Sequence, residues 1–344
     1  MGDTRVMTTM ALIGTGNWGK NLVRNYAGLR SARLKYCVDQ DEKRLATLGA
    51  QYPDTEFTPD LDKVLADPEV EAIGIAASAV AHHPLGMRAL AAGKHTYIEK
   101  PLALSTQQAA ELVAEADKRN LRLMVGHLLL YHPAVTMLKQ VIQSGELGDV
   151  YYIYSQRINL GIIRSDENAL WSLAPHDISV ALYLFDAMPT SVSARGATYI
   201  QRDADIEDVV FANVGFGDGR MLNLHISWLD PAKVRRITVV GSKKMAVFDD
   251  TESTEKLRIY DKGVEKPDYE SYGDSLTLRY GDIHIPRLPM TEPLRLECEH
   301  FVECVAEGTR PLTDGASGLA VVQVLEAAQQ SLKQNGAPVS IAAQ

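Results

Sequence analysis

The stretch VMTTMALIGTGNWG, residues 6–19, decides the fold of the first half of this chain. It begins as an apolar strand and ends in a turn with the glycine spacing G-x-G-x-x-G, and residues 20–29 then carry apolar side chains at helical spacing. Such a turn between a strand and a helix is typical of a dinucleotide site, because glycines let backbone approach a pyrophosphate at the helix N-terminus. The alternative is an ordinary glycine turn.

The next strand, residues 33–38, favours the dinucleotide interpretation. It ends at Asp39, where a carboxylate would accept from the ribose 2′-hydroxyl of NAD and repel the 2′-phosphate of NADP. Arg44 is near enough to soften this preference, so NAD is expected and NADP is the less favoured cofactor. The predicted cofactor contacts are Gly14, Gly16, Asn17, Trp18, Gly19, Asp39, Arg44, Ser78, His82 and Glu99.

Strand and helix patterns alternate as far as residue 127. This alternation predicts an α/β fold with an N-terminal Rossmann domain, residues 1–127, built on a doubly wound parallel sheet. Ser78, His82, Glu99 and Lys100 all follow directly after predicted strands. We therefore expect them at the carboxyl edge of the sheet, where ligands bind in such folds.

From residue 128 to residue 344 the pattern changes to successive strands, which predicts an α+β domain for substrate binding with a large, mostly antiparallel open sheet. The expected strands are 150–159, 191–199, 209–216, 221–228, 235–240 and 245–249. Residues 251–289 are polar and read as an irregular sheet edge or excursion, and helices are expected at 294–307 and 315–334. Because helices would cover one sheet face only, a partner subunit is expected on the other, in a homodimer or homotetramer.

Composition excludes several other classes. A net charge of −9 argues against a nucleic-acid partner, which needs a basic face. Residues 1–5 lack the character of a signal peptide, and the chain has no apolar run long enough to span a membrane, so no membrane partner is expected. Three cysteines do not make a disulfide framework, so a cytoplasmic location is expected. Glu297, His300 and Cys304 share a helix face but lack a fourth ligand, so no metal is predicted.

The triplet Glu99-Lys100-Pro101 carries the proposed chemistry. From position alone, Lys100 is either a general base or a surface lysine that opens a loop. Together with the glycine turn and a later helix that carries His176, the triplet resembles the Gfo/Idh/MocA oxidoreductases. The resemblance implies NAD(P)-dependent chemistry on sugars or cyclitols, a catalytic lysine at Lys100, which is often followed by a cis peptide bond, and a catalytic histidine at His176. The family pattern has an aspartate where this chain has Ser172.

Three further stretches, residues 126–133, 168–177 and 227–231, resemble the UDP-N-acetylglucosamine 3-dehydrogenase branch. The resemblance implies hydride transfer between nicotinamide and C3 of a nucleotide-linked hexose. A free-sugar or inositol dehydrogenase is the alternative enzyme, and a non-catalytic NAD-dependent sensor or repressor is the alternative of another class. The predicted substrate contacts are Tyr131, Arg157, Asn159, Arg164, Asn168, Trp171 and Asp177, although Tyr131 fits a packed core equally well and the arginines fit a solvated loop.

Overall fold

The computed structural model describes residues 7–204, 206–265 and 276–341. Val6 and the amino-terminal stretch assessed for a signal peptide lie outside these residues. The described residues fall into two compact units. Unit 1 groups Met1–Tyr131 with Thr291–Gln323, and unit 2 groups His132–Met290 with Val324–Gln344. No helix in the described parts of the chain is long and apolar enough to cross a membrane.

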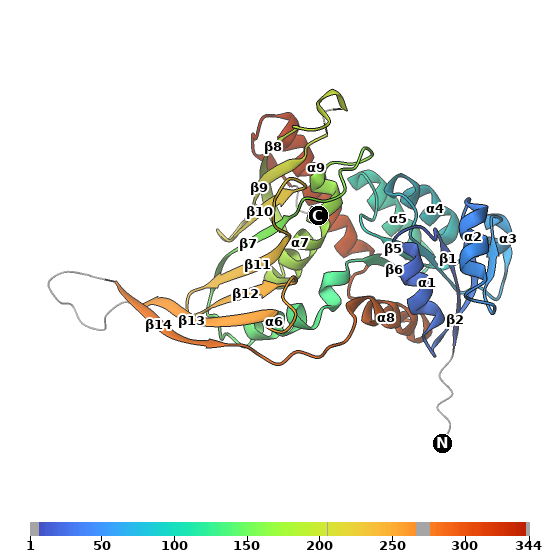
Figure 1. Ribbon diagram of the computed structural model, residues 1–344, viewed down its shortest axis with the longest axis horizontal. Coiled ribbons are helices and arrows are strands. Elements are labelled where there is room, and N and C mark those ends of the chain that lie inside the picture. The colour runs from blue at the N-terminus through green and yellow to red at the C-terminus, as the bar shows by residue number, and fades with distance from the viewer. Residues whose placement is uncertain (1–6, 205, 266–275, 342–344) are drawn as a thin grey trace, which may run out of the picture. The chain divides into compact units, whose positions relative to one another are not determined.

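The described residues of unit 1 contain a parallel sheet of six strands in the order β3-β2-β1-β4-β5-β6 (Figure 1). This confirms the predicted Rossmann architecture, in which the strand order reverses between β1 and β4. Its strands are β1 (Thr8–Ile13), β2 (Ala32–Val38), β3 (Glu56–Thr58), β4 (Ala72–Ile75), β5 (His95–Glu99) and β6 (Leu123–Gly126). Its helices are α1 (Gly19–Ala27), α2 (Glu42–Gly49), α3 (Leu61–Ala66), α4 (Ala79–Ala91), α5 (Thr106–Lys118), η1 (Leu128–Tyr131) and α8 (Pro293–Glu307).

The helices of unit 1 form where apolar side chains recur at helical spacing. Leu22, Val23 and Tyr26 of α1 are fully buried, and α1 packs on β1 and β2. Helix α8 packs on α1, β1 and η1 and buries Phe301, although its sequence lies far beyond the other elements of the unit. The contact grouping therefore differs from a simple division into residues 1–127 and 128–344, because α8 returns to the first unit.

In the part of unit 2 that the structure describes, nine strands form one sheet in the order β14-β13-β12-β11-β7-β10-β9-β8-β15. Within the described residues of this second sheet only the pair β7–β10 is parallel, which confirms the predicted mostly antiparallel sheet. The strands are β7 (Val150–Ile158), β8 (Pro189–Ala197), β9 (Val209–Phe216), β10 (Met221–Ser227), β11 (Val234–Gly241), β12 (Met245–Asp249), β13 (Leu257–Glu265), β14 (Thr277–His284) and β15 (Val339–Ser340).

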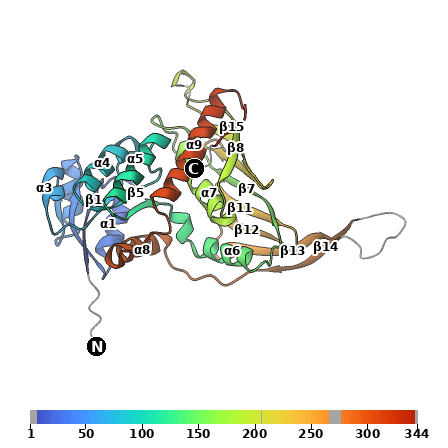
Figure 2. The ribbon, with the colours of Figure 1, turned by 180° about the vertical axis from the view of Figure 1, so that it is seen from behind.

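Helices cover one face of this sheet. Helix α7 (Ala169–Phe185) packs on β7, β9 and β10, and α6 (Pro133–Gln143) packs on β12, as both views show (Figure 2). A third helix, α9 (Gly315–Lys333), crosses the division between the units, and a short 3-10 turn, η2, spans Arg202–Ala204. The other sheet face leaves Tyr152, Tyr154, Phe211 and Met221 more than one third exposed.

The segment 251–289, expected to be irregular, contains β13 and β14 at the edge of the sheet. The edge position agrees with the expectation, but the strand content was missed. Strand β14 is exposed along almost its whole length, and β13 is mostly half-buried with charged residues in its second half, so neither sequence keeps the strict alternation of apolar and polar residues that identifies a half-buried strand. Residues 266–275 of this segment lie outside the described residues.

Candidate active site

The glycine turn between β1 and α1 is shaped so that only glycine fits at two positions. Gly14 has φ +90°, and a Cβ there would lie 2.7 Å from the backbone of Ala76. A Cβ on Gly19 would lie 2.0 Å from the carbonyl oxygen of Gly14. A Cβ on Gly16 would meet only the Arg44 guanidinium, at 3.8 Å. The turn is thus packed against the sheet and open above Gly16, which is the geometry that lets a phosphate group approach the backbone.

The N-terminus of α1 points its dipole at this open side. Trp18 is the N-cap residue, and in this fully described segment no side chain caps the first turn. The backbone N–H groups of Lys20 and Asn21 donate to the carbonyl oxygens of Gly16 and Trp18 within the turn. A helix N-terminus without a side-chain cap still favours an anion, because the aligned peptide dipoles place positive charge there. The exposed Asn17 belongs to the same turn.

Asp39 stands at the end of β2 as an ionised carboxylate. Partial burial pushes its pKa up, but hydrogen bonds from the backbone N–H groups of Thr15 and Asp41, the Thr15 hydroxyl and Arg44 outweigh burial and lower the pKa below its ordinary value. The two Thr15 contacts are each 2.8 Å, and the Arg44 guanidinium lies 3.2 Å away. The carboxylate is therefore fixed against the glycine turn and available to a ribose hydroxyl.

A hollow of about 370 Å³ opens between these groups. Gly14, Gly16, Asp39, Arg44 and Ser78, five of the predicted cofactor residues, line it. Its size lies within the range of small-molecule pockets, about 300–1,000 Å³. A bare glycine backbone, an uncapped helix N-terminus and a carboxylate are the donor set that a dinucleotide requires, so the residues present fit NAD.

Lys100 follows β5 directly and is partly buried, and the Lys100–Pro101 peptide bond is cis, as the family resemblance implied. The neighbouring Glu99 accepts from the indole N–H of Trp18, and the backbone N–H of Lys100 donates to Glu99 at 3.3 Å. Since β4 lies between β1 and β5, the Trp18–Glu99 bond bridges the end of β4. The sequence did not predict a contact between Trp18 and Glu99. This bond links the glycine turn to Glu99, the residue directly before the predicted catalytic lysine.

Two buried histidines experience the charge of Lys100. His82 contacts the carbonyl oxygens of Pro101 at 2.7 Å and Ala77 at 3.1 Å. Burial lowers the pKa of His82, and the Lys100 charge lowers it further. The two carbonyl contacts act in the opposite direction. His127 is 1% exposed, and neither ring nitrogen has a hydrogen-bond partner within the described residues. Burial and, next, the Lys100 charge lower the pKa of His127 to about 3. His127 was not predicted as a site residue. Its position directly after a strand of the parallel sheet is the feature of the sequence that could have indicated a role at the site.

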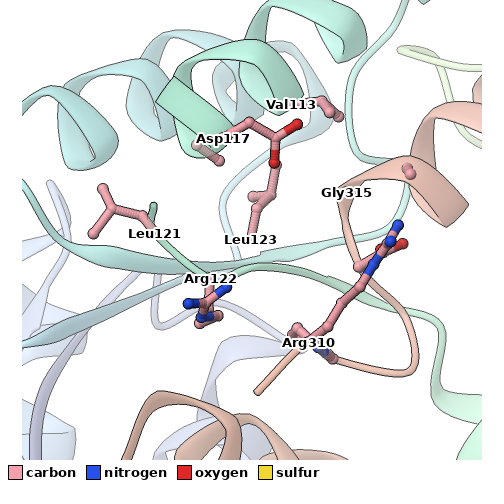
Figure 3. Close-up of a pocket in the computed structure, with 11 residues that line it drawn as sticks. Val113, Asp117, Leu121, Arg122, Leu123, Arg310 and Gly315 are labelled. Carbon is pink, nitrogen blue, oxygen red and sulfur yellow. The ribbon is translucent and has the colours of Figure 1, made fainter. Parts of the chain in front are cut away.

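A second hollow of unit 1, about 190 Å³, lies between α5, β6 and the start of α9 (Figure 3). Asp117, Arg122 and Arg310 are the charged residues among those that line it. Arg310 pairs with Asp314, so the positive charge is partly neutralised. None of the predicted site residues lines this hollow.

Several predicted substrate residues of unit 2 bind one another. Arg157 donates to Asp177 at 2.6 and 3.3 Å, and the Ser155 hydroxyl donates to the same carboxylate at 2.6 Å. The Arg157 and Asp177 side chains are 6% and 1% exposed. Their charges fix β7 to α7, an arrangement that the sequence did not indicate.

The start of α7 holds the next predicted residues. Asn168 is its N-cap, accepting from the Trp171 backbone N–H at 3.1 Å and donating to Glu207 and Gln329 at 2.6 and 2.8 Å. The Trp171 indole also donates to Gln329, at 3.2 Å. His176 is partly buried on the same helix, one turn after Ser172.

The remaining predicted substrate residues occupy different settings. Arg164 pairs with Asp166 at 2.7 Å and Glu167 at 2.9 Å and is 41% exposed. Asn159 is partly buried just beyond β7. Tyr131 belongs to unit 1, where its hydroxyl contacts Thr313 at 3.0 Å and its ring packs on His300.

Comparison with known proteins agrees with this geometry. Residues 8–127 match the family described as "Oxidoreductase family, NAD-binding Rossmann fold", and residues 135–247 match the "GFO/IDH/MocA C-terminal domain". The two matches cover more than half of the chain. The chain belongs to the Gfo/Idh/MocA family. This Gfo/Idh/MocA protein is therefore an NAD-binding oxidoreductase.

Named relatives of this family member act on sugars and cyclitols. A UDP-N-acetylglucosamine 3-dehydrogenase of Acidithiobacillus ferrooxidans is 29% identical over 90% of this chain and 93% of its own. A scyllo-inositol 2-dehydrogenase (NAD(+)) of Bacillus subtilis is 25% identical over 96% and 95%. The solved structure of the Acidithiobacillus enzyme has a TM-score of 0.80 at 26% identity and covers 96% of this chain and 99% of its own.

Proposed function

We propose that this chain transfers a hydride between NAD and a secondary alcohol of a sugar, at C3 of a nucleotide-linked hexose such as UDP-N-acetylglucosamine. The observation that carries the proposal is the placement of Lys100, which the Trp18–Glu99 bond ties to the glycine turn. The similarity to the Acidithiobacillus 3-dehydrogenase supports the substrate. Unit 1 would bind the cofactor, and unit 2 would supply substrate contacts.

In this proposal Lys100 is the acid/base. Bound NAD supplies the acceptor for the hydride that leaves the carbinol carbon. The neutral Lys100 amine takes the hydroxyl proton as the carbonyl forms, and the ammonium returns it in the reverse direction. His82 holds the backbone after Lys100 through the Pro101 carbonyl. His176 would orient the substrate hydroxyl or relay the proton, with Ser172 in place of the family aspartate.

A free-sugar or inositol dehydrogenase is the second candidate, and one observation favours it. Arg157 pairs with Asp177, and Arg164 pairs with Asp166 and Glu167. Both guanidinium groups are therefore already neutralised by carboxylates, whereas binding of a diphosphate would require them to bind phosphate oxygens. Calorimetry with UDP and turnover assays with UDP-N-acetylglucosamine and scyllo-inositol separate the two. Micromolar UDP binding together with NADH production from UDP-N-acetylglucosamine supports the nucleotide-sugar dehydrogenase. Turnover of scyllo-inositol without UDP binding supports the cyclitol dehydrogenase and contradicts the nucleotide-sugar proposal.

A non-catalytic NAD-dependent sensor is the candidate of another class. Ser172 in place of an acid is the observation behind this alternative, whereas the match to an oxidoreductase family favours the enzyme. The presence of Lys100 beside the cofactor turn supports the enzyme.

We also propose that the chain works as a homodimer or homotetramer through the open face of the unit 2 sheet. Tyr152 and Tyr154 of β7 share this face with Met221 of β10 and Phe211 of β9, and the Phe211 ring stacks on His225 at 4.4 Å. Exposed aromatic side chains gathered on one sheet face are typical of a protein interface.

The three cysteines are free and buried, which supports the expected cytoplasmic location.

A further inference from the structure

Three buried oxygen-bearing side chains meet behind Lys100 in unit 1. The Tyr97 hydroxyl lies 2.8 Å from Oε1 of Glu99 and 3.1 Å from Oε2 of Glu297. Tyr97 and Glu297 are 0% exposed, and Glu99 is 8% exposed. We call Tyr97, Glu99 and Glu297 the carboxyl cluster. Tyr97 and Glu99 share a strand face at i and i+2, whereas Glu297 comes from α8.

Counting protons shows that one carboxyl group of the cluster is neutral. A phenol has one hydrogen and donates it to one acceptor, so two ionised carboxylates would leave one of the two contacts without a proton. Two buried negative charges that share one donor also repel each other strongly. The cluster therefore holds one proton beyond that of the tyrosine.

Glu297 is the group that holds it. Its Oε1 has no hydrogen-bond partner within the described residues, whereas Glu99 receives the Trp18 indole N–H and the Lys100 backbone N–H. Burial and then the Glu99 charge raise the pKa of Glu297 well above its ordinary value. Burial also raises the pKa of Glu99, but the bonds from Tyr97 and Trp18 and the Lys100 charge oppose that rise. Bonds therefore run from the Glu297 carboxyl to Tyr97, and from Tyr97 to the Glu99 carboxylate.

The surroundings of Glu297 maintain this neutral state. Its electrostatic neighbours are Tyr97 and Glu99 on β5, Tyr26 on α1, Tyr131 on η1 and Cys298 on α8 itself. Burial raises the pKa of Tyr26, and the same holds for the Cys298 thiol, so both stay uncharged at neutral pH. The groups that contribute to the Glu297 titration in the described chain thus supply no positive charge to an ionised Glu297.

Backbone packing holds the cluster together from the side of β6. A Cβ on Gly126 would lie 2.5 Å from the Tyr97 hydroxyl and 2.9 Å from Oε2 of Glu99. The absence of a side chain at Gly126 therefore lets these two oxygens lie close to β6. The cluster has little room to rearrange without moving Glu99.

We propose that neutral Glu297 is a positioning residue for the cofactor site: through Tyr97 it orients Glu99, and Glu99 holds Trp18 of the glycine turn beside Lys100. Ionised Glu297 would stop donating to Tyr97 and repel Glu99, which loosens the hold on Trp18. The inference rests on NAD binding at the glycine turn and not on the identity of the sugar. Glu297 acts through other residues and touches neither cofactor nor substrate in this proposal.

The test is NADH binding by fluorescence titration from neutral to alkaline pH, with the wild type, Glu297→Gln and Tyr97→Phe. Because glutamine keeps a neutral donor toward Tyr97 and cannot ionise, we expect wild-type affinity at neutral pH and no alkaline loss. The wild type loses affinity as the pH rises through the raised pKa of Glu297. Tyr97→Phe removes a hydrogen bond to a charged group and weakens binding about tenfold already at neutral pH.

Tyr36→Phe is the matched control, because Tyr36 donates to Asp67, which lies outside the cluster; it should bind NADH like the wild type. Infrared spectroscopy of the protein without NADH gives an independent readout: the band of a protonated carboxyl group should be present in the wild type and absent from Glu297→Gln. An alkaline loss that persists unchanged in Glu297→Gln overturns the proposal. A neutral-pH loss in Glu297→Gln equal to that of Tyr97→Phe, with folding intact by circular dichroism, overturns it as well.

Discussion

At the scale of single residues, Lys100 is the side chain whose removal should separate binding from chemistry. Lys100→Ala leaves the glycine turn and Asp39 in place, so NADH affinity should stay within a factor of a few. Turnover should fall about 10²–10⁴-fold, the usual contribution of a positioned acid/base. Titration of NADH and steady-state kinetics on one preparation measure both, and unchanged turnover would exclude Lys100 as the base.

His127 offers a second test beside Lys100. It is buried with both ring nitrogens unpartnered within the described residues, and leaving a polar group in that state costs stability. If the ring only fills space, His127→Phe should retain turnover and raise the thermal midpoint. If it serves the Lys100 site, turnover should fall while the midpoint holds or rises. Differential scanning calorimetry and a turnover assay distinguish these results.

Asp39 should set cofactor choice through its charge. Asp39→Asn keeps an oxygen for Thr15 but removes the negative charge nearest to the Arg44 guanidinium, which retains Asp41 as an acidic partner at 3.4 Å. We expect NADH affinity to fall about tenfold, the value of a lost charged hydrogen bond, while NADPH affinity rises. Fluorescence titration with both cofactors gives the ratio. Asp60→Asn removes an equal charge from the N-cap of α3, and a similar change in that control would refute the specific role of Asp39.

At the scale of elements, the pair Arg157–Asp177 fastens β7 to α7. Arg157→Met strands a buried carboxylate and should lower the free energy of unfolding by about 3–5 kcal/mol, whereas Arg157→Met with Asp177→Leu should recover most of the loss. Urea denaturation measures both variants. A small effect of the single variant would show that solvent reaches the carboxylate, contrary to its 1% exposure.

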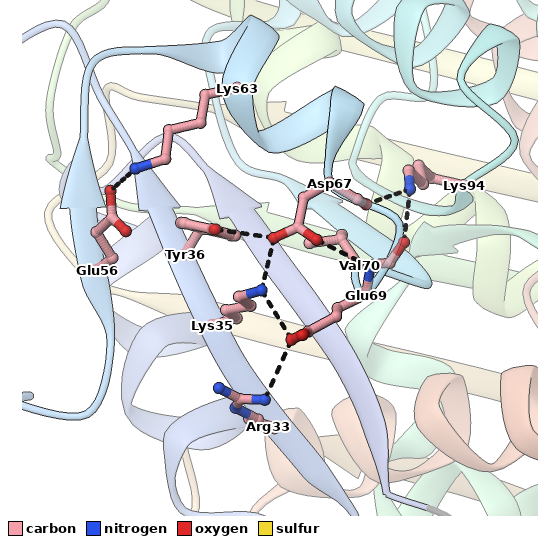
Figure 4. Close-up of polar contacts among 9 residues, drawn as sticks. All are labelled: Arg33, Lys35, Tyr36, Glu56, Lys63, Asp67, Glu69, Val70 and Lys94. Atoms are coloured by element: carbon pink, nitrogen blue, oxygen red, sulfur yellow. Dashed lines mark hydrogen bonds and ion pairs between the residues drawn. The ribbon is translucent and has the colours of Figure 1, made fainter.

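The ion pairs around Asp67, at the end of α3, link β2 to the α3–β4 connection (Figure 4). Asp67 accepts from Lys35, the Glu69 backbone and the Tyr36 hydroxyl, and these bonds lower its pKa from 3.8 to about 2. Since the folded pKa is depressed, its contribution is full above pH 3.8 and is lost as the pH falls toward 2. Asp67→Asn should make the free energy of unfolding, measured by urea titration, fall less steeply as the pH is lowered below 3.8. Asp62→Asn, at an 89% exposed aspartate, should leave that dependence on pH unchanged.

Local sequence predicted the elements far better than the bonds between them. The opening βαβ unit could be predicted because Gly14, Gly19 and Asp39 lie close together in the chain and each has a steric or charge requirement. The contact between Tyr97 and Glu297 could not, since it joins positions 200 residues apart. Nothing in a single sequence distinguishes a buried glutamate from a solvated one on an amphipathic helix. Arg157 and Asp177, 20 residues apart, looked like ligand residues for the same reason.

At the scale of the whole molecule, assembly should depend on the open face of the unit 2 sheet. Phe211 is 51% exposed on that face, and Phe211→Glu would place a charge in any interface formed there. We expect the oligomer to dissociate in light scattering coupled to size exclusion. Tyr199→Glu, which alters an exposed aromatic residue outside the strands, should leave the mass unchanged. If the wild type is already a monomer, the sheet face has another role.

The parallel pair β7–β10 has a consequence for how unit 2 folds. Strand β7, residues Val150–Ile158, is central in the sheet, yet its two neighbours come from Met221–Ser227 and Val234–Gly241. During synthesis β7 is the first strand of this sheet to be made. Both of its edges then stay without their native partner strands until more than sixty further residues have been added. Long-range pairing of this kind slows folding and exposes strand edges. The centre of the sheet can therefore form only after both neighbouring strands have been made, and the edges of β7 need protection until then.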